Sequence, residues 1–232
     1  MSNVFDHPWL GGLFGDEEAA AIWSPQRQLT HMLAFESAFT RSLGRVGSVP
    51  ANIANNLADQ IAGFQVDLGD LHSGSATDGL PVPALVSQLR KMAGENSKAV
   101  HTGATSQDVI DTALSLTLIE FNSMLRNRLT DAVSAITRLE RRFGTQTLMG
   151  RTRMQAAVPI TVSDRLRTWS GPLQNHLQRL EQIRPRLELL QLGGAVGDRA
   201  AFSTHATDIA ADMATELGLG NPETSWHATR DG

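Results

Sequence analysis

The hydrophobic pattern is clearest between residues 103 and 144, where no internal glycine or proline interrupts the chain. Its apolar residues recur every three or four positions, at Leu114, Leu118, Phe121, Leu125, Leu129, Val133, Ile136 and Leu139. This spacing predicts a single helix of about 35 residues, roughly 50 Å long at about 1.5 Å per residue. Helices in globular proteins average about 11–12 residues, so this length indicates a bundle of long helices.

Local signals predict a helix before the long one. Ser24 followed by Pro25 is typical of a helix start, because serine caps free N–H groups and proline fits the first turn. We expect this helix to end at Gly47. The segment 69–83 is rich in glycine, serine, aspartate and proline and is predicted to be a loop. No part of the sequence reads as a run of strands, so the predicted fold class is all-α.

A second bundle helix is predicted after the long one. It should begin near Thr161 or Ser163 and bend at Gly171 and Pro172. Pro185 also lies within the helical pattern and predicts a kink, because it removes one backbone hydrogen bond and crowds the preceding turn.

A later helix completes the set, with Ser203 or Thr204 as its cap and Gly218 as its end. Long helices that each carry one apolar stripe do not close a core alone, so we expect both further chain downstream and partner subunits. The expected organisation is an N-terminal helical domain at 1–103 and the first part of a central long-helix bundle at 104–232.

Composition narrows the class of protein. Of the 232 residues, 41% are hydrophobic and 19% charged, a balance typical of a globular protein. The absence of cysteine excludes disulfides, thiolate metal sites and a cysteine nucleophile. A net charge of −4 argues against nucleic acid and anionic membranes as partners. No stretch resembles a signal peptide or a membrane helix, which favours the cytoplasm.

The segment HTGATSQDVIDT, which begins at His101, stands at the start of the long helix. Its small residues, hydroxyls and free backbone N–H groups are suited to binding an anion. The alternative is a structural cap made by Thr105 or Ser106, with Asp108 in the first turn. Taken alone, His101 is more typical of a hydrogen-bonded loop histidine. The residues by themselves leave the anion site and the cap equally open.

The order of these residues resembles the signature shared by adenylosuccinate lyases and bacterial 3-carboxy-cis,cis-muconate cycloisomerases of the fumarase/aspartase superfamily. The resemblance implies that Thr105 and Ser106 contact a substrate carboxylate and that His101 lines the same pocket. Gln107 and Asp108 belong to the same motif and are expected to bind substrate with them.

A second motif, GRTRMQAAVPIT at residues 150–161, resembles the family's second conserved region. Superfamily lyases usually carry histidine after this threonine, and the cycloisomerases typically carry a bulky residue such as tryptophan. Arg153 stands there instead, which disfavours an adenylosuccinate lyase and leaves the general acid unassigned. Arginine does not donate protons near neutral pH, because its pKa lies above about 12, but it can bind an anionic group. The alternative is a solvated cluster with Arg141 and Arg142.

Two later stretches extend the resemblance. QLGGAVG at residues 191–197 resembles a glycine-rich turn of the cycloisomerases, which close packing alone explains. SWHATRD at residues 225–231 resembles a family region that faces an active site, with departures at Ser225, Ala228 and Thr229. His227 and Arg230 are therefore candidate site residues, whereas Trp226 is expected in the core.

The superfamily's third region, which carries the serine usually assigned as the catalytic base, has no counterpart in this sequence. We therefore expect a chain truncated before the C-terminal part of the bundle. The resemblance further implies a homotetramer whose active sites are shared between subunits.

The implied reaction is an intramolecular addition. A carboxylate oxygen of 3-carboxy-cis,cis-muconate adds across a conjugated double bond and closes 4-carboxymuconolactone, a step in protocatechuate breakdown. Charge develops on a neighbouring carboxylate, so the site needs donors aimed at it and a proton source. No metal or organic cofactor is implied. The candidate catalytic residues are His101, Ser106 and Arg153, and the candidate substrate-binding residues are Thr105, Gln107, Asp108, Thr152, Gln155, His227 and Arg230.

Three alternatives remain. One is a related cycloisomerase acting on another anionic muconate, such as a sulfonated one, with Arg153 contacting the changed substituent. The second is a lyase of the same superfamily. The third, from a different class, is a non-catalytic helical assembly protein.

Overall fold

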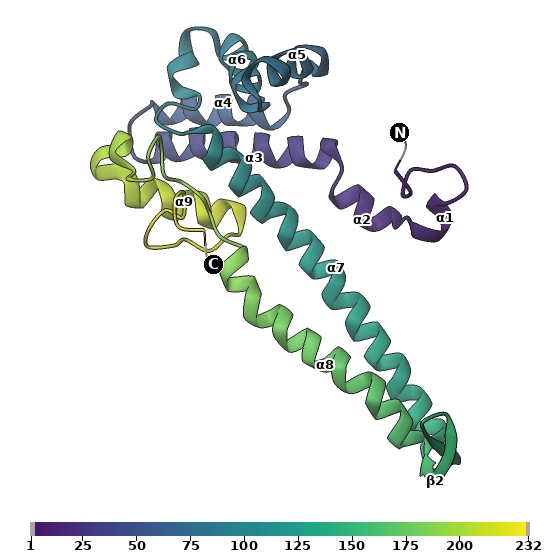
Figure 1. Ribbon diagram of the computed structural model, residues 1–232. Coiled ribbons are helices and arrows are strands. Elements are labelled where there is room, and N and C mark those ends of the chain that lie inside the picture. The colour runs from purple at the N-terminus through teal and green to yellow at the C-terminus, as the bar shows by residue number, and fades with distance from the viewer. Residues whose placement is uncertain (1–2, 231–232) are drawn as a thin grey trace. The chain divides into compact units, whose positions relative to one another are not determined.

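The computed structural model describes residues 3–230, and helices account for most of them (Figure 1). This confirms the predicted all-α fold class. The helices are α1 (Gly11–Phe14), α2 (Glu17–Ile22), α3 (Pro25–Arg45), α4 (Ala51–Ala62), α5 (Leu68–Asp78), α6 (Val82–Ala93), α7 (Ser106–Phe143), α8 (Val162–Leu187) and α9 (Ala206–Leu217). Two 3-10 helices, η1 (Gly94–Ala99) and η2 (Ala200–His205), and two strands, β1 (Thr147–Thr152) and β2 (Gln155–Thr161), complete the elements.

The chain forms two compact units. The first comprises residues 1–119 and 186–232, and the second comprises residues 120–185. Helices α7 and α8 each contribute residues to both units. The expected domain boundary at 103/104 differs from this division and stays a prediction for the whole protein.

The first unit has a core centred on α3, which packs against α4 and α9. The helix begins as predicted, since the Ser24 side chain accepts a hydrogen bond from the Arg27 N–H and Pro25 occupies the first turn. It ends at Arg45, just before Gly47. Phe39 lies at its centre, fully buried, with its ring centroid 5.7 Å from that of Phe202.

The predicted loop at 69–83 is wrong, because α5 and the first turn of α6 occupy most of it. Asp67 caps α5 by accepting hydrogen bonds from the N–H groups of Gly69 and Asp70. A Cβ atom at Gly74 would lie 2.5 Å from the Cβ of Ala84. This glycine therefore serves the close approach of two helices rather than a turn.

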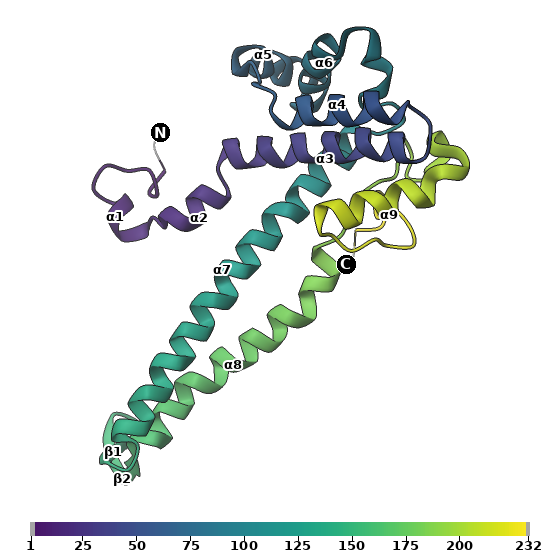
Figure 2. The same ribbon diagram turned by 180° about the vertical axis from the view of Figure 1, so that it is seen from behind.

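The second unit contains the distal part of α7, the hairpin of β1 and β2, and most of α8. Figures 1 and 2 show these parts of α7 and α8 side by side, with the hairpin at their joined end. The long helix is confirmed at 38 residues. The expectation that no strands form is wrong: β1 and β2 pair antiparallel and are connected through Arg153 and Met154. Both connecting residues have positive φ, 46° and 67°, as two-residue hairpin turns require.

The remaining helix boundaries follow local signals closely. Helix α8 begins at Val162, between the two predicted starts, and continues through Pro172 and Pro185 to Leu187. Helix α9 ends at Gly218 in the left-handed conformation, as predicted. The predicted cap at Ser203 or Thr204 is wrong, because η2 precedes α9 and its N-cap residue makes no side-chain hydrogen bond.

Candidate functional site

Asp108, in the first turn of α7, connects two segments that lie far apart in the sequence. Its carboxylate is fully buried and accepts hydrogen bonds from the backbone N–H groups of Thr105 (3.0 Å), Gly193 (2.8 Å) and Gly194 (3.0 Å). The side-chain amide of Gln191 donates a fourth at 3.1 Å. Burial raises the pKa of Asp108, and these donors oppose the rise. Because every donor comes from the chain itself, Asp108 positions the motif and has little capacity left for a ligand.

Gln191 extends this network to the third motif. Its backbone exchanges hydrogen bonds with the Thr112 hydroxyl, at 2.9 Å to the carbonyl oxygen and 3.1 Å from the N–H. Its side-chain oxygen accepts from the Trp226 N–H, and its amide donates to the Ser225 hydroxyl. The fully buried Gln191 thus holds the segments 101–112, 189–194 and 225–230 together. In the sequence, the only signal for this glutamine is its place at the start of the glycine-rich turn.

The side chains of the three residues directly before Asp108 behave differently. Thr105, Ser106 and Gln107 are half-buried, and their side chains make no hydrogen bond within residues 3–230. At the start of α8, by contrast, the Thr161 hydroxyl donates to Asp164 at 2.7 Å. Because Asp108 is occupied by backbone N–H groups, the Thr105 hydroxyl stays available, beside the positive end of a long helix.

His101 lies directly before this turn. Its φ of 59° places a non-glycine residue in the left-handed region. Its Nδ1 atom lies 2.5 Å from Oε1 of Glu36, a fully buried residue of α3. The guanidinium of Arg90 donates to the preceding carbonyl, that of Val100. The histidine is therefore held from two sides rather than solvated.

The third motif contributes two predicted residues. Arg230 forms a bidentate ion pair with the buried Asp111, at 2.7 and 3.0 Å, and this contact raises its pKa. With the Trp226 ring beneath it, Arg230 lines a cavity of about 240 Å³. His227 is half-buried, and its buried Nδ1 atom has no hydrogen-bond partner in the part of the chain that the structure describes. Asp231, the last residue of this motif, lies outside the described residues.

Sequence reasoning missed two charged residues beside this network. Glu36 is the only acid on the buried face of α3 between Met32 and Phe39, and an acid within an apolar stripe was the available signal. Arg199 donates to the Leu192 carbonyl at 2.7 Å, and burial lowers its pKa against the opposing charge of Asp108. One of its terminal nitrogens is buried without a partner. The only sequence signal for the role of Arg199 is its place beside the glycine-rich turn.

The second motif belongs to the other compact unit. Thr152, Arg153 and Gln155 are exposed at the tip of the hairpin, and the Met154 side chain is 91% exposed. Within residues 3–230, the side chains of the tip make one hydrogen bond, from the Arg151 guanidinium to the Met154 carbonyl at 3.3 Å. Within the described chain, the exposure of Arg153 agrees with the solvated cluster and leaves its predicted substrate contact untested.

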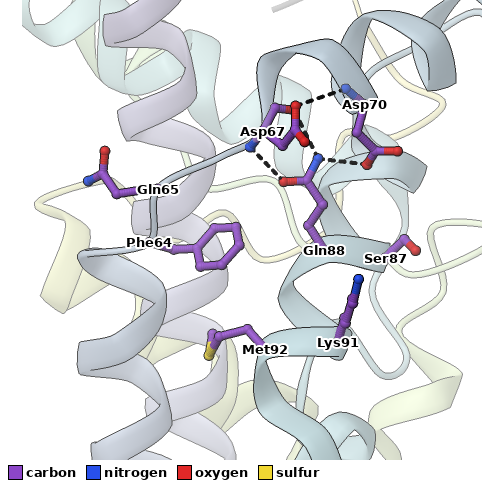
Figure 3. A pocket seen from close by; sticks show the side chains of 8 residues that line it. All are labelled: Phe64, Gln65, Asp67, Asp70, Ser87, Gln88, Lys91 and Met92. Atoms are coloured by element: carbon purple, nitrogen blue, oxygen red, sulfur yellow. Dashed lines mark hydrogen bonds between the residues drawn. The ribbon is translucent and has the colours of Figure 1, made fainter.

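A larger cavity, of about 560 Å³, lies between α4, α5 and α6 (Figure 3). Figure 3 shows Gln88 between Asp67 and Asp70, accepting from the Asp67 N–H at 2.9 Å and donating to the Asp70 carboxylate at 2.8 Å. Asp67 caps α5, and Asp70 in the first turn donates its backbone N–H to the Asp67 carboxylate. None of the predicted site residues lines this cavity, so we do not assign it a function.

Residues 3–230 contain neither a membrane-spanning helix nor a cluster of metal-binding side chains. No helix there combines the length and the apolar character that a bilayer span requires. No group of three or more histidine, aspartate or glutamate side chains there is arranged to hold a metal ion.

Comparison with known proteins gives a consistent result. The sequence model of the family described as "Lyase" matches residues 18–231. A 3-carboxy-cis,cis-muconate cycloisomerase of Pseudomonas aeruginosa is 36% identical over 100% of this chain and 51% of its own length. An N-acetyl-S-(2-succino)cysteine lyase of Dickeya dadantii is 29% identical over 99% of this chain and 51% of its own.

A solved structure shows the same fold. The 3-carboxy-cis,cis-muconate lactonizing enzyme of Pseudomonas putida superposes with a TM-score of 0.89 at 33% identity, covering 97% of this chain and 52% of that chain. The chain thus spans about half the length of the relatives it matches.

Proposed function

This chain belongs to the Lyase family, within the fumarase/aspartase superfamily, and from that premise we propose that the protein lactonizes 3-carboxy-cis,cis-muconate to 4-carboxymuconolactone. The relative named as a cycloisomerase is 36% identical and the relative named as a succinocysteine lyase 29%. Relatives named as cycloisomerases range from 29% to 36% identity and relatives named as lyases from 29% to 33%, so identity alone does not separate the two reactions. What favours lactonization is Arg153, which stands where the superfamily's lyases usually carry histidine.

The observation that carries the proposal is the turn before α7. Among the described residues, the hydroxyls of Thr105 and Ser106 have no hydrogen-bond partner at the start of a 38-residue helix, while Asp108 holds the turn from within. Free backbone N–H groups and hydroxyls at such a position favour a carboxylate. A rigid arrangement is what electrostatic stabilisation of a developing charge requires.

The proposed reaction places these groups around the substrate. One substrate carboxylate oxygen forms a C–O bond to the diene, and the electron pair of that double bond moves toward the carboxylate conjugated with it. Thr105 and Ser106 donate to that carboxylate. A proton is then delivered to the adjacent carbon, and His101 donates a hydrogen bond or the proton itself. Gln155 and Arg153 bind the remaining carboxylates.

We also propose that the active protein is a homotetramer with shared sites. The second unit leaves large apolar side chains exposed, including Met154 (91%), Val158 (63%) and Trp169 (56%). Within that unit, the hairpin carrying Thr152, Arg153 and Gln155 is exposed along most of its length. Large apolar side chains left exposed on one unit favour protein association there. A partner subunit would place the second motif at a substrate site.

The test is an ultraviolet assay of the full-length protein with 3-carboxy-cis,cis-muconate, following the loss of diene absorbance and identifying the lactone. Rapid loss with lactone as product supports the proposal. Turnover of a sulfonated muconate instead would keep the chemistry and change the substrate. Turnover of N-acetyl-S-(2-succino)cysteine with release of fumarate would replace lactonization with elimination.

A further inference from the structure

Glu36 is an acid in the interior of the first unit. It lies on α3 among buried residues such as Phe35 and Phe39, and its own exposure is 0%. A carboxylate is seldom buried unless a partner compensates for the lost hydration. Within residues 3–230, its Oε2 atom has no hydrogen-bond partner. Its one compensating contact is therefore at Oε1, with Nδ1 of His101, 65 residues further along the chain.

The backbone around His101 is built to keep this contact. Arg90 donates two hydrogen bonds of 3.2 Å to the Val100 carbonyl just before it. Thr102, the residue just after His101, donates its hydroxyl to the Lys98 carbonyl at 2.6 Å. A left-handed φ at a non-glycine residue persists only where surrounding contacts enforce it, and such positions cluster at functional sites.

The contact also decides which nitrogen of His101 carries the hydrogen. A carboxylate only accepts hydrogen bonds, so Nδ1 must donate. The other nitrogen, Nε2, has no partner within residues 3–230, and the side chain keeps 11% of its surface exposed. A carboxylate that orients a histidine through one nitrogen leaves the second free for proton transfer.

We propose that Glu36 is a positioning residue that holds His101 in the Nδ1–H tautomer and directs Nε2 toward the substrate. The second half of this statement rests on the proposed function. The first half is a property of the unliganded protein, so the two are tested separately.

The tautomer is read from solid-state nitrogen-15 spectra of the full-length, histidine-labelled protein, with the His101 signals assigned by their loss in His101→Asn. We expect a protonated Nδ1 and an unprotonated Nε2 in the neutral ring. Glu36→Leu should shift His101 to the Nε2–H tautomer that free histidine prefers, whereas Glu36→Gln should retain Nδ1–H because its oxygen still accepts. Glu95→Gln, at an exposed acid nearby, is the matched control and should change nothing.

Circular dichroism and thermal unfolding first establish that the variants fold. Glu36→Leu keeps a similar volume but leaves the Nδ1–H of His101 without its acceptor, so a loss of stability is expected and folding must be shown before the spectra are compared. An Nε2–H signal in the unchanged protein would overturn the proposal, as would an Nδ1–H signal that persists in Glu36→Leu.

Turnover tests the second half. With a substrate that the unchanged protein converts, Glu36→Leu should lower kcat at least tenfold with KM changed less than threefold, and Glu36→Gln should recover part of that loss. An unchanged kcat in Glu36→Leu would refute the positioning role. If the unchanged protein does not convert carboxymuconate, the proposed function fails, while the tautomer result on Glu36 stands.

Discussion

Helices α7 and α8 begin with the same local pattern, a threonine followed three residues later by an aspartate. In both, the aspartate accepts a hydrogen bond from the N–H of that threonine, at 3.0 Å for Asp108 and 2.9 Å for Asp164. Asp164 is exposed and also binds the Thr161 hydroxyl. Asp108 is buried and turns to Gly193 and Gly194 instead. One pattern thus gives a plain helix cap in the second unit and the centre of a buried network in the first.

The comparison distinguishes motif residues that are held by contacts within the chain from motif residues that are exposed. Three residues of the first motif are explained within the chain. Asp108 is fixed by its donors and His101 by Glu36, and the Phe202 ring leaves no room for a Cβ atom at Gly103. The hairpin carrying Arg153 has no comparable internal explanation, since its tip is exposed. The reason for a specific exposed motif must be sought in what it contacts outside the described chain.

Among the proposed substitutions, Asp108→Ala should change the free energy of unfolding most. Removing the carboxylate leaves four donors without their acceptor, and we expect a loss of about 3 kcal/mol or more in the free energy of unfolding. Asp164→Ala, which removes an exposed cap, should cost about 1 kcal/mol. Urea unfolding of both variants measures the contrast, and equal losses would contradict it.

A glycine pair extends the comparison between units. Gly103 has φ of 93°, and an added Cβ would lie 2.8 Å from the Phe202 ring, so Gly103→Ala should cost about 2 kcal/mol. Gly171 lies within α8 with nothing within 4 Å of an added Cβ. Gly171→Ala should therefore stabilise the protein by roughly 0.5–1 kcal/mol. Thermal unfolding reports both, and destabilisation by Gly171→Ala would show that a neighbour occupies that space.

Arg153→Ala should separate function from stability. We expect KM for 3-carboxy-cis,cis-muconate to rise at least tenfold, about 1.4 kcal/mol, through loss of a charge-assisted contact. The free energy of unfolding should change by less than about 0.5 kcal/mol, because the side chain is exposed. Arg141→Ala is the matched control. Equal kinetics in the two variants would assign Arg153 to the solvated cluster.

The smallest expected effect is on pH dependence. Hydrogen bonds from Thr161 lower the pKa of Asp164 below its ordinary value of 3.8. A lowered pKa in the folded state stabilises the protein above pH 3.8, and the contribution is lost as the pH falls through the lowered value. The stability difference between the unchanged protein and Asp164→Asn should therefore shrink on acidification below that pH.

The contribution of Asp108 to stability should depend on pH with the opposite sign to that of Asp164. Burial raises its pKa, so its contribution is full below pH 3.8 and is lost as the pH rises through the raised value. Unfolding measured from acid to neutral pH should give slopes of opposite sign for Asp108→Asn and Asp164→Asn. Parallel slopes would mean that the two carboxylates share one environment.

Much of the fold was predictable where the signal is local. The Ser24 cap, the Gly218 end and the 38-residue helix all depend on contacts between residues a few positions apart. The hairpin was missed because its turn uses Arg153 and Met154 at positive φ, where the usual asparagine or glycine signal is absent. Helix α5 was missed because its Gly74, which suggested a loop, allows close packing against α6.

The candidate site divides in the same way. The sequence by itself determined the family, the long helices and the motif residues, because motif order and helical period are read along the chain. Only the tertiary structure decided that Asp108 is a buried anchor, that Arg230 is paired with Asp111, and that Glu36 contacts His101. These contacts join residues 65 to 119 positions apart, and neither periodicity nor spacing along a single sequence contains that information.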